Sequence, residues 1–287
     1  QEDKIIVLSG GGTGGHITPI LAVAHELKKQ DPTVKTVYIG ERNGKFKELT
    51  DSHEAIDVSY EIWAGKFRRY HGESWLRRLL DVRTNFLNAR DLFYFGIGTV
   101  QSWFLIRKLQ PSVVFLKGGF VGVPVGLAAH RHHVPFITHD SDALPGLANR
   151  LVGRWAKTHA VAMPAEIYAY PAAKTIQVGV LVEDSFKPVT KDIQNAMKQQ
   201  IEVPVEATML LITGGSSGAH NINVAVKQIV DELLVEYPDL YIVHQAGKGK
   251  AGIYGNYAHE RLRVIEFMRP MYAYTGAADV VVSRASG

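Results

Sequence analysis

The first apolar run of the chain, Lys4 to Ser9, is followed by a series of glycines and then by apolar residues at helical spacing from Ile17 to Lys29. The run predicts a buried strand because it is continuous and short, and the spaced pattern predicts an amphipathic helix. Further short runs follow, with helical patterns between most of them, at Thr36–Ile39, Val113–Leu116, Phe136–Thr138 and His159–Ala162. Strands that alternate with helices predict βαβ units and a mostly parallel sheet.

The same opening occurs a second time later in the chain. Thr208 to Thr213 predicts a strand, Gly214 to Gly218 a glycine loop, and His220 to Tyr237 a helix. Further strands are expected at Leu240–His244, Arg263–Glu266 and Asp279–Ser283. The chain is therefore expected to contain two Rossmann-like, doubly wound α/β domains.

The boundary between these domains is expected near Leu181, where the pattern weakens into a polar stretch that runs to Pro204. One amphipathic helix is expected in this stretch, from Ile193 to Ile201. The predicted domains are residues 1–181 and 182–287. Because doubly wound sheets commonly have five or six strands, the second domain is expected to be incomplete.

Length and composition are those of an ordinary globular chain. Its 287 residues suit two domains, and 46% apolar with 21% charged residues is close to the average for folded proteins. The net charge of +4 gives no support for a nucleic-acid partner. The absence of cysteine excludes disulfides, thiolate metal sites and cysteine nucleophiles, and it suits a reducing cytosol. The longest uncharged apolar stretch, Leu92 to Ile106, is shorter than the ~18 to 20 residues of a membrane-spanning helix.

The first glycine loop, Gly10 to Gly15, matches the pattern G-x-G-x-x-G between a strand and a helix. Backbone N–H groups and the start of a helix attract phosphate in this setting, so we interpret the loop as a phosphate site. The alternative is a turn that only allows close packing of strand and helix. A nicotinamide cofactor would also require an acid about 20 residues further on for the ribose, and Glu41 fits that spacing only loosely.

The second glycine loop repeats this argument, with the hydroxyls of Ser216 and Ser217 beside its amides. Two such loops in two similar domains predict a ligand with phosphates on both sides of a cleft. No G-x-x-x-x-G-K-[ST] sequence occurs, which argues against a P-loop nucleoside triphosphatase.

His16 directly follows the first loop, in the expected first turn of a helix. The positive end of the helix dipole disfavours protonation there, so His16 is our preferred general base, with a purely structural histidine as the alternative. A second histidine group, His130, His132 and His133, precedes Pro135. These side chains suit the end of a helix better than a metal site.

Residues 66–90 form a basic stretch with apolar side chains at helical spacing, among them Trp75, Leu76, Phe86 and Leu87. This pattern is typical of a helix lying on an anionic membrane surface. It is equally typical of a helix that packs on its own sheet with a solvated basic face, and the two interpretations stay open.

Five motifs now occur in one familiar order: Gly11-Gly-Thr-Gly-Gly-His16, Gly118-Gly-Phe-Val-Gly-Val-Pro124, Pro145-Gly-Leu-Ala-Asn149, Gly214-Gly-Ser-Ser-Gly-Ala219 and Ala278-Asp-Val-Val-Val-Ser-Arg284. With this combination the chain resembles the MurG family, the N-acetylglucosaminyltransferases that form the disaccharide of the lipid-linked peptidoglycan precursor. The resemblance runs essentially from end to end, and the family continues for about half a domain beyond Gly287.

The resemblance implies a two-domain GT-B glycosyltransferase that inverts the anomeric centre, requires no metal or other cofactor, and acts peripherally at the cytoplasmic face of the bacterial inner membrane. UDP-N-acetylglucosamine would be the donor, bound by the C-terminal domain. An undecaprenyl-diphosphate-linked muramoyl-peptide would be the acceptor, bound by the N-terminal domain.

Residue by residue, the resemblance implies roles for the matching positions. Thr13 and His16 would contact the acceptor diphosphate and the reacting hydroxyl. Transfer with inversion also needs a base for that hydroxyl, and our own assignment of this role is His16, with Asp142 as the alternative. The acceptor would contact Thr13, Gly14, Gly15, Phe120, His139 and Asp140. The donor would contact Gly215, Ser216, Ser217, Asn223, Phe267 and Met268, with Asn223 facing the cleft and the last two flanking the uracil.

Two motifs depart from the usual family pattern. The family usually has His-Glu-Gln-Asn where this chain has His139-Asp-Ser-Asp142, which places a carboxylate near an anionic acceptor. The family's Asn-Pro-Val-Arg is Val180-Leu-Val-Glu183 here, which replaces a cation with an acid. These departures keep a second hypothesis open, a noncatalytic or altered nucleotide-sugar binder of the same fold. A third, a nicotinamide oxidoreductase, rests on the G-x-G-x-x-G loop, and the duplicated glycine loop argues against it.

Overall fold

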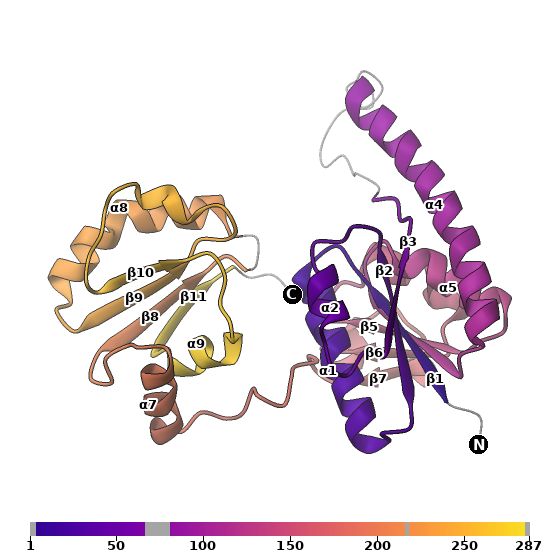
Figure 1. Cartoon of the computed structure of the whole chain (residues 1–287), viewed down its shortest axis with the longest axis horizontal. Helices are drawn as coiled ribbons and strands as arrows, with labels where there is room; N and C mark the ends of the chain where they lie inside the picture. The colour runs from indigo at the N-terminus through magenta and orange to yellow at the C-terminus, as the bar shows by residue number, and fades with distance from the viewer. Residues whose placement is uncertain (1–3, 67–80, 216–217, 285–287) are drawn as a thin grey trace. The chain divides into compact units, whose positions relative to one another are not determined.

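The computed structural model describes residues 4–66, 81–215 and 218–284 of the chain. It divides into two compact units, Gln1–Glu183 and Asp184–Ser286, here called the N-domain and the C-domain. Each domain consists of a parallel sheet with helices on both faces (Figure 1). The predicted fold class of two parallel α/β domains is thereby confirmed.

The N-domain is built on a seven-stranded parallel sheet in the order β3-β2-β1-β4-β5-β6-β7. Its strands are β1 (Ile5–Gly10), β2 (Lys35–Glu41), β3 (Val58–Ile62), β4 (Val113–Gly118), β5 (Phe136–Asp140), β6 (Thr158–Val161) and β7 (Thr175–Gln177). Its helices are α1 (Gly14–Gln30), α2 (Lys47–Asp51), α4 (Val82–Leu109), α5 (Gly122–Arg131) and α6 (Leu147–Val152), with 3-10 turns η1 (Gly153–Trp155), η2 (Ala165–Ile167) and η3 (Ala172–Lys174).

Alternate residues of each central strand enter different cores of the N-domain. Ile6 and Leu8 of β1 pack against α1, whereas Val7 between them packs against α4 and α5. The strands are buried on both faces, which explains why they occur in the sequence as continuous apolar runs rather than as alternating ones.

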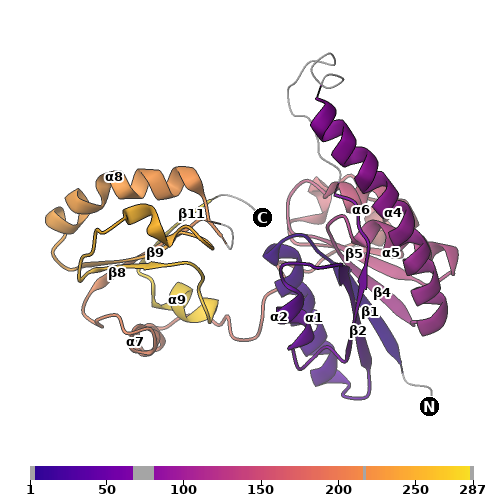
Figure 2. The ribbon, with the colours of Figure 1, turned by 45° about the horizontal axis from the view of Figure 1, so that its top comes forward.

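The C-domain has a four-stranded parallel sheet in the order β10-β9-β8-β11. Its strands are β8 (Thr208–Thr213), β9 (Leu240–Gln245), β10 (Leu262–Ile265) and β11 (Val280–Ser283). Its helices are α7 (Lys191–Gln200), α8 (His220–Glu236) and α9 (Met271–Ala277), with a 3-10 turn η4 (Ala251–Tyr254). Helices α7 and α9 cover one face of the sheet and α8 covers the other (Figure 2).

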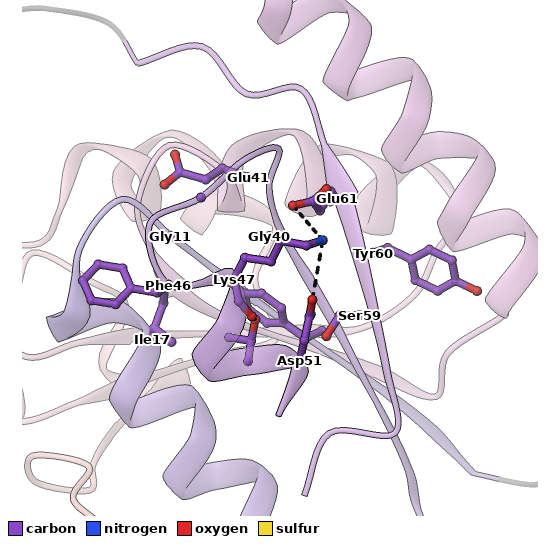
Figure 3. A pocket seen from close by; sticks show the side chains of 13 residues that line it. Gly11, Ile17, Gly40, Glu41, Phe46, Lys47, Asp51, Ser59, Tyr60 and Glu61 are labelled. Atoms are coloured by element: carbon purple, nitrogen blue, oxygen red, sulfur yellow. Dashed lines mark hydrogen bonds and ion pairs between the residues drawn. The ribbon is translucent and has the colours of Figure 1, made fainter. Parts of the chain in front are cut away.

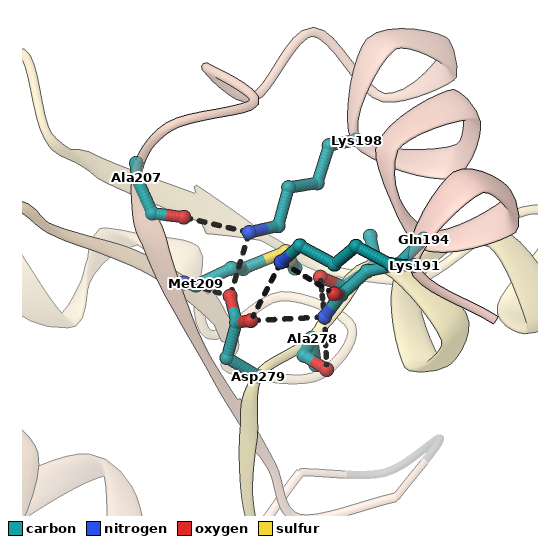
Figure 4. A network of polar contacts seen from close by, with 8 residues as sticks. Lys191, Gln194, Lys198, Ala207, Met209, Ala278 and Asp279 are labelled. Atoms are coloured by element: carbon teal, nitrogen blue, oxygen red, sulfur yellow. Dashed lines mark hydrogen bonds and ion pairs between the residues drawn. The ribbon is translucent and has the colours of Figure 1, made fainter. Parts of the chain in front are cut away.

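A buried ammonium group joins three elements of the C-domain. Lys198 of α7 is 1% exposed, and its Nζ donates to Asp279 Oδ2 and to the carbonyl of Ala207, each at 2.6 Å (Figure 4). The same carboxylate accepts the N–H of Met209 in β8 at 2.8 Å. The network therefore fixes α7 against the start of β8 and the start of β11.

Each sheet reverses its winding beside its first strand. In the N-domain the order turns between β1 and β4, and in the C-domain it turns between β8 and β11. Ligands of open α/β sheets bind at the carboxyl ends of the strands on either side of such a point. Both glycine loops follow the strands at these two positions, since the first follows β1 and the second follows β8.

Candidate functional site

The first glycine loop is held tightly at the carboxyl end of β1. The Tyr38 hydroxyl donates to the carbonyl of Gly10 at 2.8 Å, and Gly12 has a φ of +89°, a conformation that favours glycine. Gly14 and Gly15 are the first two residues of α1, so helix geometry leaves their N–H groups without a carbonyl partner inside the helix. These amides at the positive end of the helix form the anion-attracting part of the loop.

A second turn, Gly118 to Phe120 after β4, lies against the first loop. Gly118 pairs with Gly10 across the two strands. A side-chain carbon on Gly119 would collide with the backbone of Gly11, and one on Gly12 would lie 2.9 Å from the Phe120 ring. The structure thus brings Thr13, Gly14, Gly15, His16 and Phe120, all of them predicted site residues, to one end of the N-domain sheet.

His16 lies in the first turn of α1, where the sequence places it. Its Nδ1 is 2.8 Å from the Thr13 hydroxyl oxygen, and its backbone N–H bonds the Thr13 carbonyl at 3.1 Å. Burial lowers the pKa of His16 below 6.5, and Lys117 lowers it further, while Asp142 and Asp140 act in the opposite direction. The expected neutral imidazole is therefore favoured, with burial rather than the helix dipole as the largest cause.

The acidic loop after β5 contributes charge to the same place. Asp140 is 5% exposed and accepts hydrogen bonds from the N–H of Gly146 at 3.0 Å and from the Tyr170 hydroxyl at 2.9 Å. The Asp142 residue is exposed. Lys117 of β4 is buried, and its ammonium donates to Ser141 Oγ at 3.0 Å. Lys117 was missed by the sequence analysis, although a lysine in an apolar strand directly before two glycines is a detectable signal.

The side chain of His139 differs from its expected role as an acceptor contact. It is fully buried, and its Nε2 lies 3.2 Å from the carbonyl of Gly179. Burial, with Lys117 nearby, lowers its pKa to about 4. The imidazole is packed near the Phe115 ring of the neighbouring strand, with 6.4 Å between the ring centroids, and it is closed off from solvent.

A small pocket of about 20 Å³ lies beside the first loop, between Gly11 and the ends of β2 and β3 (Figure 3). Lys47 pairs there with Glu61 at 3.1 Å and with Asp51 at 3.5 Å. Burial raises the pKa of Glu41, while Lys66 and a hydrogen bond from the N–H of Gly12 oppose this rise. That volume corresponds to about one water molecule.

The second glycine loop is described on either side of Ser216 and Ser217, which lie outside the described residues. Gly215 is exposed with a φ of +77°, and its N–H donates to Thr213 Oγ1 at 3.0 Å. Arg284, which follows β11, places Nη2 3.5 Å from the point where a side-chain carbon of Gly215 would lie. The Arg284 guanidinium thus lies beside the loop. Arg284 was not among the predicted site residues, although it is the last residue of the fifth motif.

Two predicted donor residues have buried side chains. Asn223 is 1% exposed, donates to the carbonyl of Ala246 at 2.8 Å and accepts from His244 Nε2 at 3.1 Å, so it faces the core under α8 and not a cleft. Met268 is 4% exposed within the core formed with α7 and α9, whereas Phe267 is 44% exposed. Of this last pair, only Phe267 has an exposed side chain.

The basic stretch predicted for a membrane surface is described only in part, because residues 67–80 lie outside the description. Helix α4 begins at Val82 and carries an apolar stripe on one face, formed by Phe86, Phe93, Val100 and Phe104, each between 56% and 70% exposed. The N-terminal half of α4 extends beyond the strands of its own domain (Figures 1 and 2). No helix within the described residues is long and apolar enough to cross a membrane.

The histidine group at the end of α5 makes structural contacts. His130 stacks on Trp155 with 4.6 Å between ring centroids, and His132 Nε2 lies 3.2 Å from the carbonyl of Trp103. In the described part of the chain, no three His, Asp or Glu side chains gather where they could hold a metal ion.

Comparison with known proteins identifies the family. The glycosyltransferase family 28 N-terminal domain matches residues 6–161, and the C-terminal domain of the same family matches residues 209–286. The chain belongs to glycosyltransferase family 28. The resemblance to MurG that the sequence motifs indicated is confirmed. Because the family consists of glycosyltransferases, the expected enzyme class is confirmed as well.

Curated relatives of this family 28 chain bear one name. The UDP-N-acetylglucosamine–N-acetylmuramyl-(pentapeptide) pyrophosphoryl-undecaprenol N-acetylglucosamine transferase of Lachnospira eligens is 35% identical over 290 residues, which cover 98% of this chain and 73% of the relative. The transferase of that name from Treponema pallidum is 35% identical over 250 residues, which cover 86% of this chain and 59% of the relative.

Solved structures agree on the fold. Acinetobacter baumannii MurG has a TM-score of 0.63 at 24% identity, covering 99% of this chain and 74% of that one. The glycotransferase of kitacinnamycin has a TM-score of 0.68 at 14% identity, covering 100% and 76%. A UDP-GlcNAc 2-epimerase from Neisseria meningitidis, bound to UDP-GlcNAc, has a TM-score of 0.61 at 16% identity, covering 98% and 77%. At these identities the likeness concerns the fold alone.

Proposed function

We propose that the protein transfers N-acetylglucosamine from UDP-N-acetylglucosamine to the muramoyl hydroxyl of a polyprenyl-diphosphate-linked acceptor, the reaction for which its family 28 relatives are named. The observation that carries the proposal is the pairing of Thr13 with His16 beside the first glycine loop, at the switch point of the N-domain sheet. A potential base and an anion-attracting helix start lie together there.

His16 would act as the base of an inverting displacement. The acceptor oxygen forms a bond to C1 of the sugar, the bond from C1 to the UDP oxygen breaks, and its electron pair leaves on UDP. The acceptor proton moves to Nε2 of His16. The tautomer that carries hydrogen on Nδ1 donates to Thr13 Oγ1 and leaves the Nε2 lone pair available for this proton.

The N-domain would hold the acceptor diphosphate. The N–H groups of Gly14 and Gly15 and the positive end of α1 supply favourable partners for a phosphate. The Phe120 ring packs over Gly12 and would shield one side of the reacting hydroxyl from water. Asp140 and His139 would act indirectly, because their side chains are buried, and Asp140 holds the loop that contains Asp142 through the N–H of Gly146.

The C-domain would hold UDP-N-acetylglucosamine. The second glycine loop and Arg284 lie at the switch point of its sheet, where a diphosphate would meet backbone amides and a guanidinium group. Phe267 would pack against the uracil ring. Stabilisation of the charge on departing UDP by such groups is a large part of the rate in comparable reactions, about 3 kcal/mol for a well-placed donor.

Attachment to the cytoplasmic face of the membrane would bring the enzyme to its lipid-linked acceptor. The apolar stripe of α4 supports this assignment, because phenylalanines exposed along several helical turns lose contact with water on entering a lipid surface. The excess of basic residues in the stretch 66–90 would attract anionic head groups.

The direct test is a transfer assay with the full-length protein, UDP-[14C]N-acetylglucosamine and a polyprenyl-diphosphate muramoyl-pentapeptide in detergent. Label that moves into the lipid product would support the proposal, and His16→Gln in the same assay should abolish this transfer. Calorimetric titration with UDP-N-acetylglucosamine runs in parallel. Donor binding without transfer would favour the altered nucleotide-sugar binder, and no binding would contradict the donor assignment.

A further inference from the structure

Lys117 is a buried cation at the carboxyl end of the N-domain sheet. It lies one residue before the end of β4, where the other side chains are apolar, and it is 4% exposed. Burial of an ammonium group is unfavourable unless partners compensate for it. Its Nζ donates to Ser141 Oγ at 3.0 Å, so the side chain is directed from the sheet toward the loop after β5.

Lys117 and its neighbour Gly118 lie close to the first glycine loop and to His16. A side-chain carbon on Gly10 would lie 3.3 Å from Cβ of Lys117, and one on Gly118 would lie 3.7 Å from Cδ2 of the His16 ring. The chain at Lys117 and Gly118 is therefore close both to the strand that leads into the glycine loop and to the imidazole that follows this loop.

The charged groups that face His16 come from three elements. Lys117 belongs to β4, Asp140 ends β5, and Asp142 lies in the loop that follows. His139, also on β5, stays neutral over most of the pH range because burial and Lys117 lower its pKa to about 4. Two carboxylates that favour a protonated imidazole are thus opposed by one ammonium group that disfavours it.

We propose that Lys117 is a positioning residue of the transfer reaction: its buried ammonium group offsets Asp140 and Asp142 and keeps the His16 imidazole neutral, ready to accept the acceptor proton. This inference rests on the proposed function of the site. It also explains how the chain tolerates Asp142 and Asp140 beside an anionic acceptor, because Lys117 reduces the negative potential that they create.

Burial excludes the simpler role of Lys117 as a direct diphosphate ligand. A group that is 4% exposed and bonded to the neutral Ser141 hydroxyl has almost no surface open to an anion from solvent. The two roles differ in their kinetics. A direct ligand would change the KM for the acceptor, whereas control of His16 changes the pH at which the enzyme becomes active.

The test is Lys117→Met, which keeps the length of the side chain and replaces a buried charge with a group that suits an apolar strand. Histidine ring resonances of the full-length protein are titrated by NMR, and His16 is assigned by its loss in His16→Gln. We expect the His16 midpoint in Lys117→Met to rise by about half a unit to one unit. The pH midpoint of the acid limb of kcat/KM should shift upward by the same amount. Lys117→Arg should return both midpoints to their native values.

Lys198→Met is the matched control, since Lys198 is as buried as Lys117 but lies in the C-domain. It should leave the His16 midpoint where it is. Asp142→Asn is a second variant at an exposed position, and it should move the midpoint down, because it removes one of the opposing carboxylates.

An unchanged or lowered His16 midpoint in Lys117→Met would overturn the inference. A higher KM for the acceptor in Lys117→Met, with no change in the pH midpoint of the acid limb of kcat/KM, would also overturn it. If Lys117→Met does not fold, an Asp142→Asn midpoint that fails to move down overturns it instead. The NMR titration does not depend on turnover, so absence of transfer in the native enzyme would contradict the proposed function while the Lys117 result still stands.

Discussion

The hydroxyl oxygen of Thr13 lies 2.8 Å from Nδ1 of His16, one helical turn along the chain. Thr13 is the N-cap residue of α1, yet its side chain makes no capping hydrogen bond to the helix backbone. Threonine at an N-cap normally uses its oxygen for such a bond. Here the hydroxyl orients the imidazole instead, which links the start of the helix to the proposed chemistry.

Thr13→Val should therefore reduce catalysis with little effect on stability. Valine keeps the shape but cannot bond Nδ1, so the ring loses both its preferred tautomer and its orientation. We expect kcat/KM to fall about 10- to 100-fold, in line with the loss of an orienting hydrogen bond of roughly 1–3 kcal/mol. Steady-state transfer assays measure the effect. Thr18→Val, at an exposed position of the same helix, is the control and should leave the rate unchanged.

The two candidate bases can be separated by substitution. His16→Gln should lower kcat at least ~100-fold if His16 is the general base. Asp142→Asn should keep activity within about tenfold of the native enzyme, because in this scheme the carboxylate acts only through the field at His16. The reverse pattern, with Asp142→Asn inactive and His16→Gln active, would transfer the role to Asp142.

The pH dependence of transfer follows from the lowered pKa of His16. A base must be unprotonated, and burial with Lys117 lowers the pKa of His16 below its ordinary value of 6.5. Activity should therefore persist on acidification through pH 6.5 and fall only at lower pH. A kcat/KM profile between pH 5 and 8 measures this limb. An acid limb centred above 6.5 would contradict His16 as the titrating group.

The order of strands and helices could be predicted from the sequence because the central strands are buried on both faces and occur as continuous apolar runs. Two N-domain strands were not predicted. In β3, Val58-Ser-Tyr-Glu-Ile62 mixes polar and apolar residues at the edge of the sheet. The other, β7, has three residues and is largely exposed at the opposite edge. Neither leaves a continuous apolar signal.

The candidate site was predictable in its position and less so in its side chains. Glycine loops after strands indicate where a phosphate would lie, and the structure brings Thr13, His16 and Phe120 together there. A motif does not show which way a side chain turns, and His139, Asn223 and Met268 are all buried. For His139 the alternation of a strand decides this, for Asn223 the inner face of α8, and for Met268 the packing of the loop after β10 against α7 and α9; all three depend on tertiary packing.

Removal of two phenylalanines from the α4 stripe should weaken membrane binding. We expect Phe86→Ser with Phe93→Ser to reduce binding to vesicles of dioleoyl phosphatidylglycerol at least ~10-fold, because a buried phenylalanine contributes about 1.5–3 kcal/mol. Vesicle sedimentation measures the bound fraction. Val235→Ser removes a side chain that is 82% exposed in the C-domain and should change nothing. Equal sedimentation of the double variant and the native protein would exclude the stripe as the membrane contact.

Loss of the Asp279 carboxylate should destabilise the C-domain. Burial would raise the pKa of Asp279, but hydrogen bonds from Lys198, Met209 and Gln194 outweigh it and lower that pKa below 3.8. Asp279→Asn leaves the buried Lys198 ammonium without its counter-charge, and we expect a loss of roughly 2–4 kcal/mol in the free energy of unfolding. Glu206→Gln, at an exposed position near β8, is the matched control.

Urea unfolding can be followed separately in the two domains, because all four tryptophans of the chain lie before residue 184. Tryptophan fluorescence therefore reports unfolding of the N-domain. The urea midpoint that it gives should be the same in Asp279→Asn and in the native protein. Pulse-labelled hydrogen exchange of β8 and β9 reports the C-domain, and its midpoint should fall. If the exchange midpoint of β8 and β9 is the same in Asp279→Asn as in the native protein, the network contributes nothing measurable to stability.

His244 should make the C-domain sensitive to acid. The ring is fully buried on β9, and its nitrogens lie 2.8 Å from the Tyr254 hydroxyl and 3.1 Å from Asn223 Oδ1. Burial lowers its pKa to about 4, whereas the unfolded chain takes up the same proton near 6.5. The stability that this neutral ring contributes is present above pH 6.5 and is lost as the pH falls toward 4, by roughly 3 kcal/mol in total.

His244→Gln cannot titrate, so its C-domain midpoint in the same hydrogen-exchange experiment should depend less on pH between 7.5 and 4.5. A pH dependence as steep as that of the native protein would assign the acid sensitivity to other groups.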